Sequence, residues 1–206
     1  LFWKIALLSL LIALPFAWVA VLLISNEISR VVERSAGVRL QELAYNAADK
    51  LDRNLFERYG DVQAFAQSAP ARSMNPVAIQ NWMNTMTRTY APIYRLMVAA
   101  DRNGKIIAAN SIGLDGRSVQ TAQLIGRDVS DSQWYQRAAY GPLTDGSSLV
   151  EDVHLDDLQE AVYGRDAALA MSFTAPIKNA SGQIVGVWSN RFNWNVAETI
   201  LEEVRD

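Results

Sequence analysis

The 206-residue sequence predicts an α+β protein, in which a five-stranded antiparallel sheet follows a long N-terminal helix continuous with a transmembrane helix. Three observations predict this. Residues 5–24 contain no charged side chain, as a membrane span requires. Apolar residues then recur every three or four positions as far as residue 68, which is the period of a helix. Beyond Pro92 the pattern changes to extended runs joined by turn sequences, with helices set between the hairpins.

The apolar run at residues 5–24 is long enough to cross a bilayer. A run of this length spans about 30 Å as an α-helix, whereas the apolar core of a secretory signal has about 7 to 15 residues. Ser25-Asn26-Glu27 lacks a small-x-small cleavage pattern, so we expect residues 1–25 to form an uncleaved anchor, with a signal peptide as the alternative. Lys4 is the only charge before the run, and the positive-inside rule therefore places the rest of the chain outside the cytoplasm.

Residues 26–70 are expected to form a long signalling and dimerisation helix. At 1.5 Å per residue it would reach about 65 Å, and its apolar stripe, which includes Ile28 and Val38, needs cover along that length. A second copy of the chain would provide it, so we expect a homodimer. The alternative is two shorter helices packed on their own domain. Gly37 and Gly60 each cost about 1 kcal/mol relative to alanine, so we expect a bend or break near one of them.

Residues 71–195 are expected to form the globular domain. Asn75 is a predicted N-cap with Pro76 at the first helical position, and a second helix is expected over residues 130–140. The turns Asp101–Gly104 and Asn179–Gly182 each end in a glycine that suits a tight hairpin. The strands are expected at residues 94–100, 105–110, 148–153, 169–177 and 183–192. Residues 196–206 are expected to start a helix that leads to a second transmembrane segment.

Composition excludes several function classes. Apart from Lys4, the chain carries 18 basic and 22 acidic residues without a basic stripe, so nucleic acid is not an expected partner. There is no cysteine and one histidine, and neither zinc spacing, a phosphate loop nor a nucleophile motif occurs. We therefore expect no enzyme, no cofactor and no metal site.

Two further segments carry a resemblance to a known family. The first is Gly126-Arg-Asp-Val-Ser-Asp-Ser-Gln-Trp-Tyr135, and the second is the hairpin Phe173-Thr-Ala-Pro-Ile-Lys-Asn-Ala-Ser-Gly-Gln-Ile-Val-Gly-Val187. Their order, behind an apolar helix and the Asp101–Gly104 turn, resembles the Cache family over about residues 30–195. Cache domains are PAS-like extracytoplasmic sensors of bacterial chemoreceptors, sensor kinases and related proteins. The resemblance implies a PAS-like sheet and a small-molecule pocket between this sheet and the Trp-Tyr helix.

The resemblance also suggests the ligand-binding residues. It places Trp134 and Tyr135 over the pocket, although both could instead be core aromatics. Amino-acid-binding members have an arginine two residues before the tryptophan, and Ser132 stands there in this chain, which argues against α-amino acid recognition. Arg127 lies close by and could bind an anion.

An acidic segment suggests the charge of the ligand. Residues 151–166 hold six acids, which suits a cationic or amine-bearing ligand, although such segments are usually solvated. Asp166 is the preferred acid because amine-binding members place a carboxylate just before the strand that starts near residue 169, and Tyr163 lies beside it. The spacing of the acids does not match a calcium loop.

These observations predict a periplasmic small-molecule sensing domain, anchored in the bacterial inner membrane, of a transmembrane signalling receptor. A methyl-accepting chemotaxis protein is the expected receptor, and a sensor histidine kinase or a diguanylate cyclase is the alternative. From a different class, the chain could be a membrane-anchored structural or protein-interaction module. An enclosed pocket with convergent polar groups would favour sensing, and a filled sheet face would favour assembly.

Overall fold

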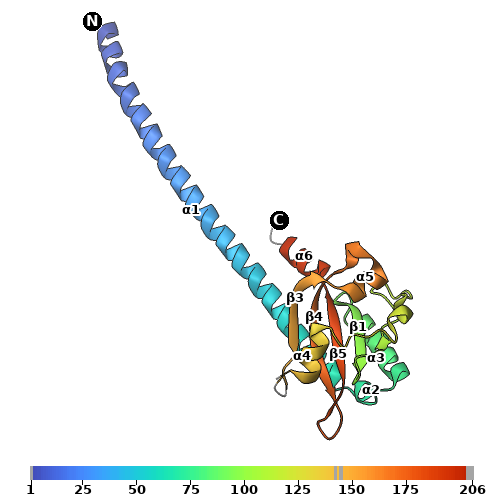
Figure 1. Cartoon of the computed structure of the whole chain (residues 1–206). Coiled ribbons are helices and arrows are strands. Elements are labelled where there is room, and N and C mark those ends of the chain that lie inside the picture. The colour runs from blue at the N-terminus through green and yellow to red at the C-terminus, as the bar shows by residue number, and fades with distance from the viewer. Residues whose placement is uncertain (1, 142, 144–145, 203–206) are drawn as a thin grey trace. The chain divides into compact units, whose positions relative to one another are not determined.

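The computed structural model describes residues 2–141, 143 and 146–202, and the side chains of these residues except 5–10 and 12. The chain divides into two compact units, residues 1–49 and residues 50–206, and each is described here by itself (Figure 1). The residues predicted to lead toward a second transmembrane segment fall partly in 203–206, outside the described residues. That prediction stays untested.

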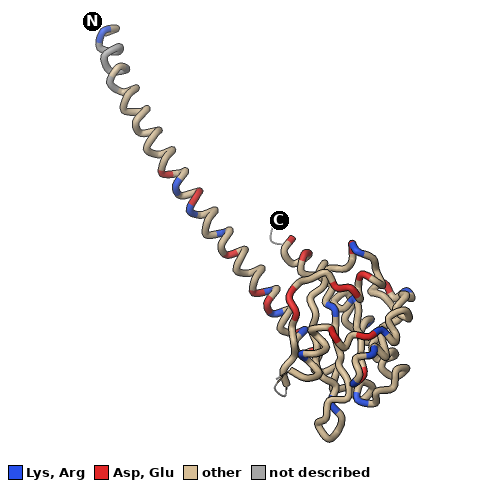
Figure 2. The backbone as a smooth tube through the Cα atoms, viewed as in Figure 1, with Lys and Arg blue, Asp and Glu red and all other residues tan. Residues whose placement is uncertain are grey.

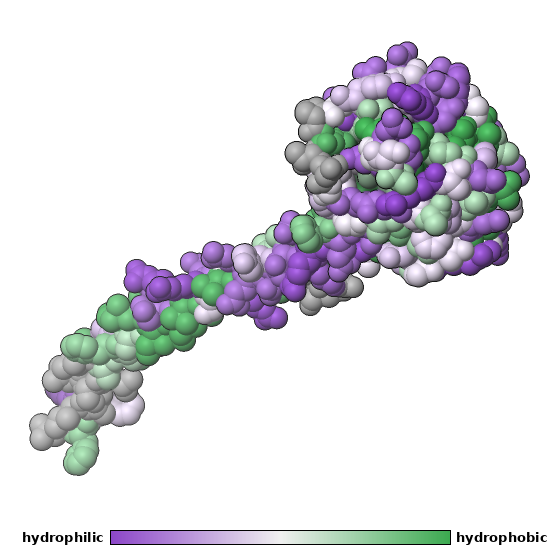
Figure 3. Space-filling view, turned by 90° about the horizontal axis from the view of Figure 1, so that it is seen from below, coloured by the Kyte–Doolittle hydropathy of each residue, from purple (hydrophilic) through white to green (hydrophobic). Residues whose placement is uncertain are grey.

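The first unit is helical. Helix α1 runs from Phe2 to Ala66, and it continues through Gly37 and Gly60, so the expected break is not found. No charged residue occurs between Lys4 and Glu27 (Figure 2), and apolar residues gather in this part of the helix (Figure 3). The part of α1 that begins at Ala13 contains a window with a mean hydropathy of 1.3, long and apolar enough to cross a membrane.

The second unit is built on one five-stranded sheet, as predicted. The strand order is β2-β1-β5-β4-β3, and every neighbouring pair is antiparallel. The predicted strand ends lie within two residues of the observed ones. The strands are β1 Tyr94–Asp101, β2 Ile106–Ala109, β3 Leu149–Leu155, β4 Leu169–Lys178 and β5 Ile184–Asn193.

Both predicted hairpin turns use the same local chemistry. The side-chain oxygen of Asp101 accepts from the backbone N–H groups two and four residues later, and Asn179 does the same in the second turn. Gly104 has a φ of +77° and Gly182 a φ of +78°. Gly104 also approaches another segment closely, because a Cβ there would lie 2.6 Å from Ser130 Cβ.

The helices that pack on the sheet are short. Asn75 caps α3 as predicted, since its side-chain oxygen accepts from the backbone N–H groups of Val77 and Ala78. Helix α4 starts at Gln133, later than expected, with Ser132 at its N-cap. Helix α5 was not predicted. The helices are α2 Ala69–Arg72, α3 Pro76–Thr89, α4 Gln133–Tyr140, α5 Asp157–Tyr163 and α6 Asn195–Glu202, with 3₁₀ turns η1 Thr121–Leu124 and η2 Arg165–Ala167.

Helices cover both faces of the sheet, and each face has its own apolar cluster (Figure 1). On one face the end of α1 and helix α3 pack on Phe173 and Trp188. On the other face Trp134 and Tyr135 of α4 pack with Val98 and Val187. Helix α4 contacts β3, β4 and β5, so it covers the sheet from its central strand β5 to the edge strand β3.

A buried polar cluster beneath α4

The sheet face under α4 is unusually polar where β3, β4 and β5 run side by side. Glu151 lies opposite Ser172 in the register, and Ser172 lies opposite Arg191, so the three form one row across three strands. In the next row Thr174 and Ser189 share a buried hydrogen bond of 2.6 Å between their hydroxyls. A sheet face covered by a helix usually carries apolar side chains, so this composition calls for a physical reason.

Arg191 is the most unusual member of this face. Its side chain has no solvent exposure, and its Cζ lies 4.8 Å from the centre of the Trp134 ring. Its Nε donates to Asp156 Oδ2 at 3.0 Å. Both terminal nitrogens, Nη1 and Nη2, are buried without a hydrogen-bond partner among the described residues. Leaving charged N–H groups unpaired inside a protein costs free energy. A ligand that accepted hydrogen bonds from them would remove this cost and so bind more tightly.

Asp156 holds Arg191 and also begins α5. Its Oδ1 accepts from the backbone N–H of Gln159 at 2.7 Å, which is an N-cap contact. His154 Nε2 lies 3.6 Å from Asp156 Oδ2. Burial by itself raises the pKa of Asp156, but the charge of Arg191 and the contacts with His154 and Gln159 outweigh burial and hold the pKa well below its usual range. The carboxylate is therefore ionised and paired.

Two more polar atoms at this face have no partner. Ser172 Oγ and Glu151 Oε2 are buried and make no hydrogen bond to any described residue. Burial raises the pKa of Glu151, and the nearby charge of Arg191 opposes that rise. We name Trp134, Glu151, Asp156, Ser172 and Arg191 the Arg191 cluster.

The structure brings the predicted aromatic residues to this face. Trp134 is 6% exposed and belongs to the cluster. Tyr135 is also buried, its ring meets that of Trp134 edge-on at 6.1 Å, and its hydroxyl donates to Asp101 O at 2.9 Å. Burial and the neighbouring Tyr140 raise the pKa of Tyr135 to about 12. The Tyr135 hydroxyl fastens α4 to the first hairpin, and no observation tests Tyr135 as a ligand-binding residue, so that role stays a prediction.

The other three predicted residues lie outside the cluster. The hydroxyl of Tyr163 donates to Arg95 O at 2.8 Å, and its ring lies 5.9 Å below the Arg95 guanidinium, so it ties α5 to β1. Asp166 lies in η2 and is exposed. Arg127 forms an ion pair with the exposed Asp157 at the start of α5. No observation tests these three as ligand-binding residues, and they stay predictions.

Sequence reasoning did not single out Arg191, Ser172 or Asp156. One signal for Arg191 was available. Side chains alternate between the faces of a strand, so Arg191 shares a face with Val187 and Ser189, and a charged residue at an inward position of a predicted strand marks a special site. The signal for Asp156 was weaker because it was one of six acids in its segment.

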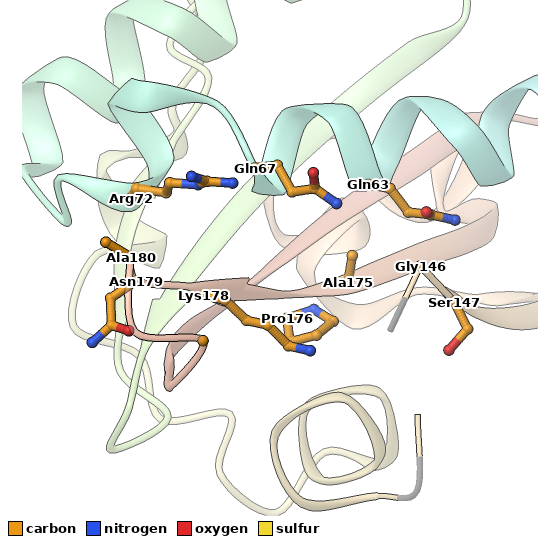
Figure 4. Close-up of a pocket in the computed structure, with 11 residues that line it drawn as sticks. Gln63, Gln67, Arg72, Gly146, Ser147, Ala175, Pro176, Lys178, Asn179 and Ala180 are labelled. Atoms are coloured by element: carbon orange, nitrogen blue, oxygen red, sulfur yellow. The ribbon is translucent and has the colours of Figure 1, made fainter. Parts of the chain in front are cut away.

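Two cavities lie elsewhere on the second unit. One of about 330 Å³ lies between the end of α1, helix α2 and the β4–β5 hairpin, where Gln63, Gln67 and Arg72 face Pro176 (Figure 4). Its lining combines amide side chains with the cationic side chains of Arg72 and Lys178. Another of about 250 Å³ lies between Tyr135 and Tyr140 of α4 and Gly186 of β5, so a cavity is present between the sheet and the Trp-Tyr helix, as the resemblance implied. Neither borders the Arg191 guanidinium. Among the described residues, no group of three or more acids and histidines could hold a metal ion.

Comparisons with known proteins identify the fold. No protein-family model and no curated protein sequence matches this chain. The sensor domain of the V. cholerae histidine kinase DctB is similar, with 12% sequence identity and a TM-score of 0.58, over 78% of this chain and 57% of that chain. The ligand-binding domain of the Pseudomonas fluorescens chemoreceptor CtaA with L-valine has 19% identity and a TM-score of 0.55, over 80% of this chain and 64% of that chain. The ligand-binding domain of the Pseudomonas aeruginosa PAO1 chemoreceptor PctC with GABA has 14% identity and a TM-score of 0.55, again over 80% of this chain and 64% of that chain.

These similarities extend over more than three quarters of this chain but over less than two thirds of each of the other chains. The chain spans 57–64% of the length of the three structures. The identities are low, so the likeness concerns the fold. It agrees with the resemblance carried by the Trp-Tyr helix and the second hairpin. This chain has the fold of the Cache-like sensor domains.

Proposed function

We propose that this chain is the extracytoplasmic small-molecule sensing part of a membrane receptor, and that the ligand binds between the sheet and α4. The Arg191 cluster carries the proposal. Four of its side-chain polar atoms, Arg191 Nη1 and Nη2, Ser172 Oγ and Glu151 Oε2, are buried without a partner among the described residues. Buried polar groups in proteins are rarely left without a partner, and a ligand that paired with these four atoms would satisfy them. The similar domains of CtaA and PctC bind L-valine and GABA.

The anchor and its orientation complete this proposal. The apolar part of α1 would cross the bacterial inner membrane, and the second unit would lie in the periplasm. The receptor would be a methyl-accepting chemotaxis protein, with a sensor histidine kinase or a diguanylate cyclase as alternatives. Both CtaA and PctC are chemoreceptors, whereas DctB is a kinase. We propose a binding role rather than a catalytic one because these neighbours are sensor or ligand-binding domains.

A homodimer through α1 is the second part of the proposal. Ile28, Val31, Val32 and Val38 are each more than half exposed on the helix of the first unit. An apolar stripe of this kind is usually covered, and a second copy of the same helix would cover it symmetrically.

The contacts of α1 within the second unit offer a route for the signal. Asp61 accepts a hydrogen bond of 2.5 Å from the Tyr94 hydroxyl, and Arg58 Nε lies 3.1 Å from the same carboxylate. The Arg58 guanidinium also lies 5.7 Å from the centre of the Tyr94 ring. Strand β1 is therefore fastened to α1, and we propose that ligand closure on the sheet shifts the helix by a small piston or rotation.

Different residues favour a cationic and an anionic ligand. The acids of residues 151–166 suggested a cationic or amine-bearing ligand, and the unpartnered Oε2 of Glu151 supports an amine contact. Asp156 does not offer one, because it is already paired with Arg191. The unpartnered nitrogens of Arg191 support an anionic group instead.

A thermal-shift screen of the full chain in detergent against metabolites tests the sensing role. Binding to the native state raises the free energy of unfolding by about 2.7 kcal/mol at a hundredfold excess over the Kd. We expect one chemical class of small molecule to raise the melting temperature. If no small molecule does so, and the chain instead forms a stable complex with a protein through the α4 face, the structural or interaction module is correct.

A further inference from the structure

We propose that the ligand carries a carboxylate, and that Arg191 and Ser172 bind this carboxylate from the sheet. The inference rests on the proposed sensing function and assigns the chemical class of the ligand. It also assigns the residues that determine specificity, neither of which belongs to the Trp-Tyr segment where the Cache resemblance places the carboxylate-binding arginine.

Part of the Arg191 guanidinium makes no hydrogen bond to any described residue. Arginine has five N–H donors in one plane, and only Nε is occupied, by Asp156 at 3.0 Å. The Trp134 ring covers the face of the guanidinium, with its centre 4.8 Å from Cζ. The free part is therefore the edge that carries Nη1 and Nη2. Two parallel N–H groups on such an edge match the two oxygens of a carboxylate.

An unpaired hydroxyl lies next to Arg191 on the neighbouring strand. Ser172 is the direct cross-strand neighbour of Arg191, and Ser172 Oγ is buried without a partner among the residues described here. Side chains directly opposite each other on neighbouring antiparallel strands have Cβ atoms about 5 Å apart, on the same face. The hydroxyl can therefore donate to the same anion that the guanidinium binds. Three unpaired donors in one row indicate an acceptor with several lone pairs.

Asp156 holds the Arg191 guanidinium in a fixed orientation. Asp156 is itself held by the backbone N–H of Gln159, and it fixes Nε, so the guanidinium has a defined plane before any ligand arrives. Such preorganisation lowers the cost of binding. Strand β5 thus supplies a guanidinium, whereas Ser132 stands at the position where amino-acid-binding Cache members carry an arginine.

The far end of the row limits what the rest of the ligand can be. Glu151 stands at the other end of the row, two strands from Arg191, and its Oε2 is unpartnered. Neighbouring strands are about 4.8 Å apart, so the backbones of Glu151 and Arg191 are about 10 Å apart along the row. A second carboxylate on the ligand would meet Glu151 and be repelled, whereas a hydroxyl or an amine would be accepted. The structure therefore favours monocarboxylates with a donor at the other end.

The test is a matched panel of probes on the full chain in detergent. The probes are monocarboxylates, namely acetate, propionate, lactate, 4-hydroxybutyrate, GABA and L-amino acids, each paired with its primary amide, together with simple amines. We expect carboxylates to raise the melting temperature and their amides to lose the effect. Stabilisation by amides or amines alone would overturn the carboxylate assignment and leave the sensing function standing. Stabilisation by no compound in this panel or in the wider metabolite screen would overturn both.

Variants locate the carboxylate. Arg191→Lys keeps the charge but loses the fork, and we expect the best carboxylate to bind about 30-fold more weakly. Ser172→Ala should weaken it about tenfold, as expected for loss of a hydrogen bond to a charged group. The matched control is Arg117→Lys, which makes the same substitution at an exposed arginine that pairs with Asp115 outside the Arg191 cluster, and it should leave the affinity unchanged.

A paired variant removes the remaining ambiguity. Asp156→Asn combined with Arg191→Gln eliminates both buried charges together and leaves neither unpaired, so it should fold even if Arg191→Lys does not. We expect this variant to bind none of the carboxylates that stabilise the parent chain. Unchanged carboxylate affinity in either the paired variant or Arg191→Lys would show that the anion binds elsewhere.

Discussion

The Arg191–Asp156 pair should be costly to break from one side. Asp156 is 3% exposed, and Arg191 has no exposed surface. We consider Asp156→Asn, because asparagine keeps an oxygen that can cap α5 and changes little except the charge. The variant leaves the buried guanidinium without a counter-ion. We expect the free energy of unfolding to fall by about 3 to 5 kcal/mol, as for one-sided loss of a buried ion pair.

The magnitude converts to a measurable change in melting temperature. For a unit of the size of residues 50–206, 1 kcal/mol corresponds to about 2 to 4 °C, so Asp156→Asn should lower the melting temperature by roughly 6 to 20 °C. The assay is thermal and urea unfolding of the full chain in detergent, followed by tryptophan fluorescence. Adding Arg191→Met, which replaces the unpaired charge by an apolar side chain of similar length, should recover most of the loss.

A neighbouring acid provides the control. Asp157→Asn removes an exposed carboxylate that pairs with Arg127, and it should change the free energy of unfolding by less than about 1 kcal/mol. Two results would show that the two buried charges do not depend on each other. One is that Asp156→Asn lowers the free energy of unfolding no more than Asp157→Asn does. The other is that the losses caused by Asp156→Asn and Arg191→Met simply add in the double variant. Asp156 would then not be the counter-ion that stabilises the buried Arg191.

Three more predictions concern pH, assembly and the first hairpin. The pKa of His154 is raised, first of all by its contact with the buried carboxylate of Asp156, so the stability that protonated His154 contributes is present below pH 6.5 and is lost as the pH rises through its folded pKa. Melting curves of the parent and His154→Gln from pH 5 to 8.5 should therefore converge at high pH, and a constant gap would contradict this. In the otherwise cysteine-free chain, Val38→Cys should cross-link in membranes more readily than Ala36→Cys, which faces away from it on the helix, and equal yields would argue against the dimer. Gly104→Ala should destabilise the fold more than Gly116→Ala, because both glycines have positive φ but only Gly104 has no room for a Cβ, and urea midpoints measure the difference.

Much of the fold could be predicted from the sequence because its signals are local. Asn75 and Pro76 start a helix by contacts within one turn, and Gly104 and Gly182 permit the hairpins by their own backbone freedom. Alternation within a strand is likewise a property of a few consecutive residues. The five strands and the aromatic helix were therefore predicted to within a few residues. Helix α5 was missed because its acids resembled a solvated loop.

The candidate site depended on contacts between distant parts of the chain. The sequence could show that Arg191 points to the inner face of its strand, but not that β5 lies beside β4, with Ser172 opposite, or that Asp156 reaches it across 35 residues. Among six acids, only burial and a partner distinguish Asp156 from the exposed Asp166. Local sequence determines how each segment folds and which way its side chains point. Which charge pairs with which, and which donors remain unpaired, was decided by strand order and register, because these bring together residues that have no contact along the chain.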